Sequence, residues 1–156
     1  MRIKIYAVGS KMPAWVEQGC QHYLKRMPRE LSVQVTEFPL VKRQKNANLE
    51  KVKAAEGAQM LSQINSRETV VALEVGGSNW TTQQVAQRLT VWQESGSDAV
   101  LLIGGPDGLS EHCLQRADSL WSLSSLTLPH PLVRVILAEQ LYRAWSILRG
   151  HPYHRE

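Results

Sequence analysis

The last six residues of the chain form its densest group of reactive side chains. They read His151-Pro152-Tyr153-His154-Arg155-Glu156 and supply two imidazoles, a phenol, a guanidinium and a carboxylate. Such groups can move protons, pair with anions and stack on flat rings. Chain ends are usually poorly ordered unless they are tied down, and here a strongly apolar segment directly precedes the tail. The tail is therefore the first place to look for function.

Three apolar segments run into stretches of small residues that could hold a ligand. The stretches are residues 73–77, 104–108 and 124–131. In parallel α/β sheets, ligands bind outside the carboxyl ends of the strands, and glycine lets a backbone approach a ligand closely. Each stretch alone is an ordinary turn, whereas the three together favour a pocket for a nucleoside-type ligand. The chain lacks the GxGxxG pattern of a dinucleotide site and the GxxxxGK[ST] pattern of a P-loop.

The charge balance predicts an anionic partner. The net charge is +4 and the isoelectric point is near 9.3, which suits nucleic acid or a phosphorylated metabolite. Five cations fall close together, at Lys42, Arg43, Lys45, Lys51 and Lys53. This cluster is either a phosphate-contacting patch or a solvated loop and helix face.

Cysteine usage and hydropathy favour a cytoplasmic protein. Cys20 and Cys113 form no CxxC pair, and we expect both to be reduced structural thiols. The first five residues alternate polar and apolar and lack the continuous apolar core of a signal peptide. The run from Ala99 to Ile103 is the longest apolar segment and is far too short to cross a membrane.

Strand and helix patterns alternate along the whole chain. We expect strands at 3–8, 31–36, 69–75, 98–103 and within 120–128, and helices at 13–27, 49–64, 81–92, 110–117 and 132–148. The third strand is expected to end at Gly76-Gly77, and Thr81 or Thr82 is expected to cap the helix that follows. Strands buried on both faces and separated by helices predict a single α/β domain over residues 1–156. Its sheet should be mainly parallel, with helices on both faces.

The final predicted helix is apolar over most of its circumference. One stripe holds Val133, Ile136, Leu137, Leu141, Ala144 and Leu148, and a second holds Val135, Ala138, Tyr142 and Trp145. A helix that packs on a sheet needs only one such face, so the second stripe predicts another burial partner. A two-fold copy of the chain is the simplest candidate, and a monomer with a deeply buried helix is the alternative.

Several longer motifs carry a resemblance to a known family. They are LLIGGPDG at 101–108, WSLSSLTLPHPLVR at 121–134, QLYRAW at 140–145 and the tail at 151–156. Ala7-Val8-Gly9, Lys11-Met12-Pro13 and the pair Lys42-Arg43 followed by Lys45-Asn46 extend the likeness to the amino-terminal half. On these motifs the chain resembles the ribosomal RNA large subunit methyltransferase H family of the SPOUT superfamily from end to end.

The resemblance implies an α/β knot, a trefoil formed where the carboxyl-terminal segment threads through a loop of the sheet. It also implies S-adenosylmethionine as cofactor and methylation of N3 of pseudouridine 1915 in 23S rRNA, on the large subunit or the assembled ribosome. The cofactor site so implied consists of Leu73, Gly104, Gly105, Ser124, Ser125, Leu126, Thr127, Leu128 and Pro129. The implied substrate-binding residues are Lys42, Arg43, Lys45, His130 and Arg134.

The tail has the groups that this reaction needs. Because N3–H of a uracil-type ring is a weak acid, its proton must be taken up or the resulting anion stabilised. His154 is either the base or a hydrogen-bond donor to phosphate. Arg155 pairs with the developing oxyanion or a phosphate, or is an ordinary surface arginine, and Tyr153 can stack on an extruded base. A dimer would let the tail of one subunit reach the cofactor of the other.

Three questions stay open at this point. His130 lies between two prolines and makes either a structural hydrogen bond to backbone or a catalytic contact. The spacing of His151 and His154, with a proline between them, does not predict a metal site. Two other functions also fit: a non-catalytic ribosome- or RNA-binding module of this fold, and a SPOUT methyltransferase that acts on tRNA.

Overall fold

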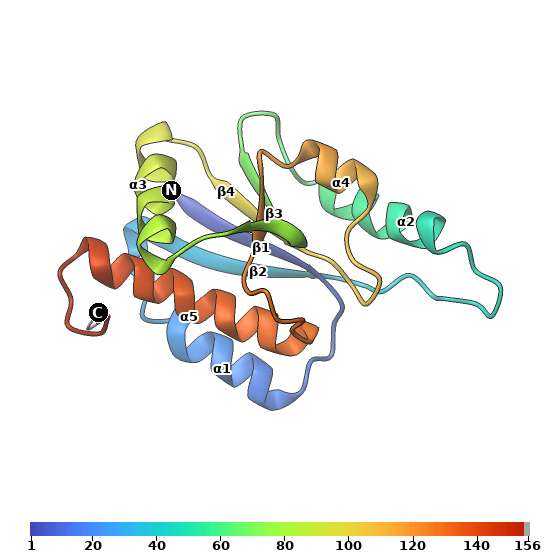
Figure 1. Cartoon of the computed structure of the whole chain (residues 1–156), viewed down its shortest axis with the longest axis horizontal. Helices are drawn as coiled ribbons and strands as arrows, with labels where there is room; N and C mark the ends of the chain where they lie inside the picture. Colours follow the sequence, from blue (N-terminus) through green and yellow to red (C-terminus); the bar gives the residue numbers. More distant parts are fainter. Residues whose placement is uncertain (155–156) are drawn as a thin grey trace.

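A five-stranded parallel sheet forms the centre of the computed structural model, which describes residues 1–154 (Figure 1). The strands are β1 (Arg2–Val8), β2 (Ser32–Phe38), β3 (Thr69–Asn79), β4 (Ala99–Ile103) and β5 (Ser119–Ser122). Their order is β2-β1-β4-β3-β5, and every neighbouring pair is parallel. The predicted mainly parallel α/β sheet is confirmed. The knot implied by the resemblance stays a prediction.

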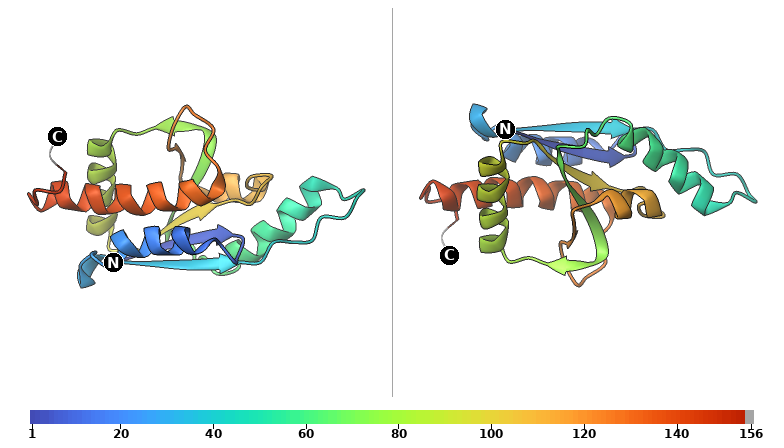
Figure 2. Two further views of the ribbon diagram at one scale, coloured as in Figure 1. Left: turned by 90° about the horizontal axis from the view of Figure 1, so that it is seen from below. Right: turned by 90° about the horizontal axis from the view of Figure 1, so that it is seen from above.

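Helices cover both faces of the sheet (Figure 2). They are α1 (Ala14–Leu24), α2 (Leu49–Leu61), α3 (Thr82–Ser95), α4 (Glu111–Arg116) and α5 (His130–Leu148), with a 3-10 turn at Arg29–Leu31. Leu101 of β4 belongs to the core beneath α3 and α5, whereas its neighbour Leu102 packs with Met60 of α2 and Cys113 of α4. Successive strand residues face opposite sides, so β4 is buried on both.

All four strand-to-strand connections share one hand. The connections through α1 and α3, on one face, both step toward the β2 edge of the sheet. Those through α2 and α4, on the other face, both step toward β5. Opposite directions on opposite faces give the same crossover hand, as right-twisted parallel strands require. This winding brings the carboxyl ends of β4, β3 and β5 next to one another.

The starts of two helices follow from local sequence. Thr81 caps α3: its hydroxyl accepts a hydrogen bond from Gln84 N at 3.1 Å, and Gln84 Oε1 accepts one from Thr81 N at 2.8 Å. This reciprocal pair is a capping box. The Ser110 hydroxyl accepts from Cys113 N at 3.3 Å at the start of α4. Ser110 was predicted to open α4, and of the two caps expected for α3, Thr81 or Thr82, the structure has Thr81.

Helix α5 finds its second burial partner within the same chain. Val135 and Ala138 pack with Val16, Cys20 and Leu24, which are residues of α1. A Cβ built on Gly19 would lie 3.2 Å from the methyl groups of Val135, so α1 and α5 approach closely there. The second apolar stripe therefore does not by itself require a second copy of the chain, and any argument for a dimer needs another observation.

Strand β3 continues past the point where it was predicted to end. It pairs with Trp121 of β5 through Leu73 and again through Ser78, so the intervening residues 74–77 form an irregularity in the strand. A Cβ on Gly77 would lie 2.7 Å from the carbonyl carbon of Leu120, which explains the need for glycine. The prediction of a strand end at Gly76-Gly77 was wrong because the strand pairs again beyond the irregularity.

The two cysteines are buried free thiols, as predicted. Burial raises the pKa of Cys20 and of Cys113, and this favours the protonated, unreactive thiol. No helix within residues 1–154 has the length and apolar character needed to cross a membrane.

Candidate active site

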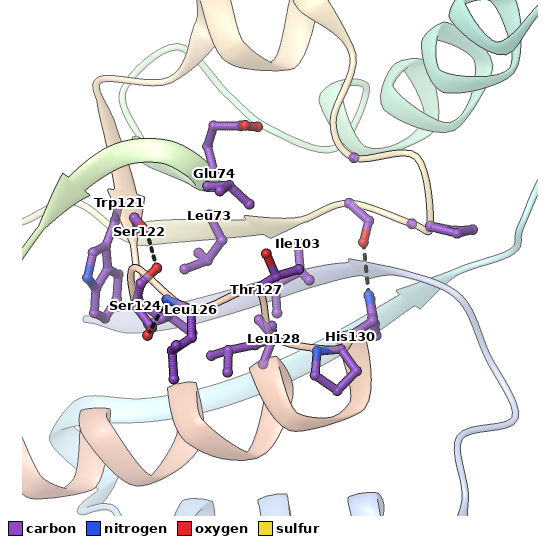
Figure 3. A pocket seen from close by; sticks show the side chains of 18 residues that line it. Leu73, Glu74, Ile103, Trp121, Ser122, Ser124, Leu126, Thr127, Leu128 and His130 are labelled. Atoms are coloured by element: carbon purple, nitrogen blue, oxygen red, sulfur yellow. Dashed lines mark hydrogen bonds between the residues drawn. The ribbon is translucent and has the colours of Figure 1, made fainter.

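A cavity of about 380 Å³ lies at the carboxyl ends of β3, β4 and β5 (Figure 3). Its walls come from the end of β3, the loop 104–108 after β4, and the loop between β5 and α5. The predicted cofactor residues that line it are Leu73, Gly104, Gly105, Ser124, Leu126, Thr127, Leu128 and Pro129. Sequence reasoning thus placed these residues at strand ends that the fold brings together around one hollow.

Ser125 is the predicted cofactor residue that does not line the cavity. Its hydroxyl lies 3.4 Å from Asn79 Oδ1, and Asn79 Nδ2 donates to Ser122 O at 3.1 Å. Inside the loop, Ser122 Oγ donates to Ser124 O at 2.9 Å, and Leu126 N donates to Ser124 Oγ at 2.9 Å. The end of β3 therefore holds the loop that forms one wall of the cavity.

The loop 104–108 is a tight turn that needs its glycines. Gly108 N donates to Gly105 O at 3.0 Å, and Gly108 has a φ of +85°, in the left-handed region. A Cβ on Gly104 would lie 2.5 Å from the carbonyl carbon of Gly108. The backbone, rather than a row of side chains, is therefore what this loop presents to the cavity.

His130 makes the hydrogen bond to backbone that was one of its two expected roles. Its Nδ1 lies 2.9 Å from Gly104 O, and Arg134 Nε donates to its Nε2 at 2.8 Å. A carbonyl only accepts and a guanidinium only donates, so Nδ1 carries the proton and the ring is neutral. Burial and the positive charge of Arg134 lower the pKa of His130. His130 therefore ties the start of α5 to the end of β4.

Arg134 is buried, at 6% exposure, and its guanidinium is occupied by the protein. Besides His130, it donates to Glu37 Oε2 at 2.6 Å and to Gly9 O at 2.8 Å. Glu37 lies near the end of β2 and Gly9 directly follows β1, so one side chain joins the ends of two strands to α5. This geometry does not support the predicted contact of Arg134 with substrate, because each of its guanidinium nitrogens already donates to a partner within the fold.

The three basic residues of the loop before α2 differ in their surroundings. Arg43 donates to Asp107 Oδ2 at 2.6 Å and to Glu56 Oε2 at 3.0 Å, so it is held inside a network of acidic partners. Lys42 and Lys45 are exposed, and neither forms an ion pair within residues 1–154. Of the three, Lys42 and Lys45 are therefore the cations that face solvent without an acidic partner in the described part of the chain.

The tail folds back on the carboxyl-terminal half of α5. The Tyr153 hydroxyl donates to Glu139 Oε1 at 3.0 Å, and Arg143 Nη1 donates to His154 O at 3.3 Å. The ring of Tyr153 packs edge-on against Tyr142, with 4.8 Å between centroids. Burial, followed by the hydrogen bond to Glu139, raises the pKa of Tyr153 to about 12. Arg155 lies outside the described residues.

One protein family matches almost the whole chain. A family model described as "Predicted SPOUT methyltransferase" matches residues 1–154. The chain belongs to the SPOUT methyltransferase family.

Individual relatives extend this SPOUT assignment over the full length. "Ribosomal RNA large subunit methyltransferase H" of Hahella chejuensis is 60% identical over 156 residues, which is all of both chains. The protein of the same name from Thioalkalivibrio sulfidiphilus is 55% identical, again over all of both chains. That from Saccharophagus degradans is 52% identical over 99% of this chain and all of its own. The resemblance stated from the motifs is confirmed.

The tail of this SPOUT domain does not meet its own cavity. Glu139, which anchors Tyr153, comes nine residues after His130, about 14 Å further along α5 and half a turn around it. Figure 1 shows the residues that directly follow α5 beside the end of this helix that is remote from the β5–α5 loop. The structure therefore brings the predicted cofactor residues other than Ser125 together around the cavity, and it places Tyr153 and His154 on the other side of the helix.

Sequence reasoning missed three residues of the SPOUT site. Glu74 lines the cavity and is its one charged lining residue among residues 1–154. Asn79 and Glu139 hold the cavity loop and the tail. Glu74 directly follows the predicted strand-end residue Leu73, which was a usable signal. The partners of Asn79 and Glu139 come from distant segments, and no local pattern announces them.

The described part of the chain holds no group of three His, Cys, Asp or Glu side chains arranged to bind a metal ion. Two buried polar side-chain atoms in that same part have no hydrogen-bond partner, Trp145 Nε1 and His154 Nδ1. Both belong to the carboxyl-terminal half of α5 and the tail. The unpaired imidazole nitrogen is the more informative of the two, because imidazole can accept a proton.

Proposed function

We propose that this SPOUT methyltransferase uses S-adenosylmethionine to methylate N3 of a pseudouridine in the RNA of the large ribosomal subunit. The observation that carries the proposal is the cavity at the ends of β3, β4 and β5, whose volume of about 380 Å³ falls in the range of small-molecule sites. The names of the relatives support ribosomal RNA of the large subunit as the substrate. Ribosomes are cytoplasmic, so we place the protein there.

The residues around the cavity suit an adenosyl ligand. Backbone groups of loop 104–108 and of the β5–α5 loop can pair with the edge of an adenine, and the apolar side chains Leu73, Ile103 and Leu128 can pack on its faces. Glu74 places a carboxylate where a positively charged ligand would bind. When bound, S-adenosylmethionine supplies a methyl group activated by the positive sulfur.

The chain's own work is to bring the acceptor nitrogen into line and to handle its proton. We assign His154 as the group that takes the N3 proton, which the unpaired Nδ1 supports. Hydrogen bonding of His154 to a phosphate is the alternative role. Arg155 would pair with the charge that spreads onto the ring carbonyls, and Tyr153 would stack on the base. Lys42 and Lys45 would bind phosphates.

We further propose a homodimer in which each active site is composite. The tail lies on the opposite side of α5 from its own cavity, so a second copy is the direct source of a tail for that cavity. Exposed apolar side chains around the cavity support the dimer, because such side chains are typical of a surface that another chain covers. Val75 is 71% exposed and Leu126 is 73% exposed. Leu132, at the start of α5, is exposed as well.

Two inactive variants can test the composite site. Deletion of residues 152–156 should leave folding and cofactor binding nearly intact while abolishing turnover. Leu73→Trp should fill the cavity and prevent cofactor binding. Co-expressed, the two should recover about a quarter of the wild-type rate, because half of randomly paired dimers are mixed and each has one complete site. No recovery, from subunits shown to mix, would contradict a tail acting across the dimer.

The substrate is tested by methyl transfer from labelled S-adenosylmethionine to intact ribosomes, separated subunits and bulk tRNA. We expect label in large-subunit RNA, at N3 of pseudouridine. Label in tRNA alone would favour the alternative SPOUT enzyme. Failure of the purified protein to bind the cofactor in calorimetry would favour a non-catalytic RNA-binding module, which has no need of a sulfonium site.

A further inference from the structure

Arg43, Glu56 and Asp107 join three segments that are far apart in the sequence. Glu56 lies on α2 and is 2% exposed. Its carboxylate accepts from the backbone N of Val41 at 3.1 Å and from Arg43 Nη1 and Nη2 at 3.0 and 3.2 Å. A buried carboxylate is tolerated only when it is paired and hydrogen-bonded. The path of the chain just before α2 is therefore fixed by a residue inside the helix.

The same arginine reaches the glycine loop of the cavity. Arg43 Nε donates to Asp107 Oδ2 at 2.6 Å, and Asp107 belongs to loop 104–108. A Cβ on Gly105 would lie 3.2 Å from Leu40 and 3.6 Å from Glu56 Oε1, so the loop also rests directly on these groups. One guanidinium thus spans the basic segment and the predicted cofactor loop.

The neighbours of Arg43 face solvent instead. Lys42 and Lys45 are exposed, and the proposed function assigns them to phosphates. Their positions relative to the cavity depend on how residues 41–45 are held, and Arg43 is the side chain in that segment that binds both α2 and loop 104–108. Its fork geometry lets it donate to two carboxylates at once, which a lysine cannot copy.

We propose that Arg43 is a positioning residue rather than a phosphate ligand. With Glu56 and Asp107 it forms a brace that sets Lys42 and Lys45 in register with the cofactor loop, so that RNA bound by the lysines is aligned with the cavity. The proposal rests on the proposed function for the identity of the anion, and on the ion pairs alone for the brace itself.

The sharpest test is Asp107→Asn, assayed by binding of purified ribosomes and by amide hydrogen exchange of the full-length protein. The brace predicts RNA binding several-fold weaker than wild type, although a negative charge has been removed, and faster exchange in both 41–45 and 104–108. Were Arg43 a simple phosphate ligand, the same change would free its guanidinium and tighten binding. Glu111→Gln, at an exposed acidic residue nearby in the sequence, is the matched charge control.

Two further variants separate charge from geometry. Arg43→Lys keeps the charge but loses the fork, so the brace predicts several-fold weaker binding with an unchanged salt dependence. Lys45→Gln should instead lower the slope of log K against log salt by about 0.7–0.9, the value for one released counterion, with no change of exchange in loop 104–108. Wild-type binding by Arg43→Lys would overturn the proposal.

These results are distinguishable from a failure of the proposed function. If the wild-type protein binds ribosomes without transferring a methyl group, the proposed methyl transfer fails. Amide hydrogen exchange and ribosome binding of the variants still test the brace in that case. If wild type is active but Asp107→Asn binds RNA as well as wild type does and exchanges no faster, the brace alone is refuted. Asp107 is partly exposed, so this variant should fold even where a change at the buried Glu56 does not.

Discussion

The two ends of α5 are built in different ways. At the amino-terminal end, His130 and Arg134 are bound to backbone or side-chain atoms of β1, β2 and β4 or the residues that follow them. At the other end, the tail is attached mainly to α5 itself, through Tyr153 and Glu139. The cavity is thus part of the protein core, whereas the tail is a separable addition. Under the proposed function, a site divided in this way can change its acceptor chemistry without a change in the cofactor pocket.

The largest effect should come from the core end. Arg134→Met removes the donor to Gly9 O, to Glu37 and to His130 in one step. Leaving the buried Gly9 carbonyl and the part-buried His130 Nε2 without this donor should lower the free energy of unfolding by about 3 kcal/mol. Urea unfolding followed by tryptophan fluorescence measures this loss.

Arg149→Ala is the matched control for Arg134. Arg149 also pairs with a glutamate, Glu30 at 3.3 Å, but both side chains are more than half exposed. Exposed pairs contribute about 1 kcal/mol at most, so this variant should unfold close to wild type. Equal losses of unfolding free energy in the two variants would mean that the buried contacts of Arg134 stabilise the fold no more than the exposed ion pair of Arg149 does.

A smaller effect is expected where the tail is anchored. Glu139→Gln weakens the acceptor of the Tyr153 hydroxyl and breaks the ion pair with Arg143. A hydrogen bond to a charged group contributes about 1.5 kcal/mol or more, so kcat should fall about tenfold. Cofactor affinity, measured by calorimetry, should be unchanged. Tyr153→Phe removes the same bond from the other side, so the double variant should be no worse than the singles.

The sequence predicted best those elements whose causes are local. The five apolar residues of β4 read as a strand buried on both faces. Thr81 and Thr82 were the expected caps of α3, and Thr81 is the one that caps it. The three strand ends around the cavity were identifiable because parallel strands place their carboxyl ends along one edge. Knowing that edge was enough to identify the stretches that line the cavity, whereas the individual residues predicted to bind the cofactor came from the family resemblance.

What the sequence did not predict depends on partners far along the chain. Gly76-Gly77 reads as a strand end because local rules cannot anticipate that Ser78 pairs again with Trp121. The second stripe of α5 indicated an unmet partner, but only the fold shows that α1 supplies it. Arg134 reads as a substrate ligand until its bond to Gly9, 125 positions away, is seen. Contacts of this kind between distant residues produce no periodic pattern in the sequence from which they could be predicted.

Within the cavity, Glu74→Gln tests whether the Glu74 carboxylate attracts the positively charged sulfur of S-adenosylmethionine. We expect several-fold weaker binding of S-adenosylmethionine and little change for S-adenosylhomocysteine, whose sulfur is neutral, because only the charged ligand loses a Coulomb attraction. Paired calorimetric titrations measure both. An equal loss for the two ligands would instead indicate that Glu74 contacts a part that they share, such as the ribose.

The smallest effect is a pH dependence that should belong to the cavity end alone. Burial and Arg134 lower the pKa of His130 below its ordinary value of 6.5, so the unfolded chain binds a proton in a pH range where the folded protein does not. The contribution of His130 to stability is therefore complete above pH 6.5 and is lost as the pH falls from there toward the lowered pKa.

The difference in unfolding free energy between wild type and His130→Gln, measured from pH 7.5 down to pH 5, isolates this contribution from those of the other histidines. It should shrink as the pH falls. The tail should not share this trend, since His130 bonds to Gly104 and Arg134 at the opposite end of the helix. A pH-independent difference would mean that the His130 ring takes up a proton as readily in the folded protein as in the unfolded chain. Its contacts with Gly104 and Arg134 would then not favour the neutral ring, and the two ends of α5 would no longer differ in this respect.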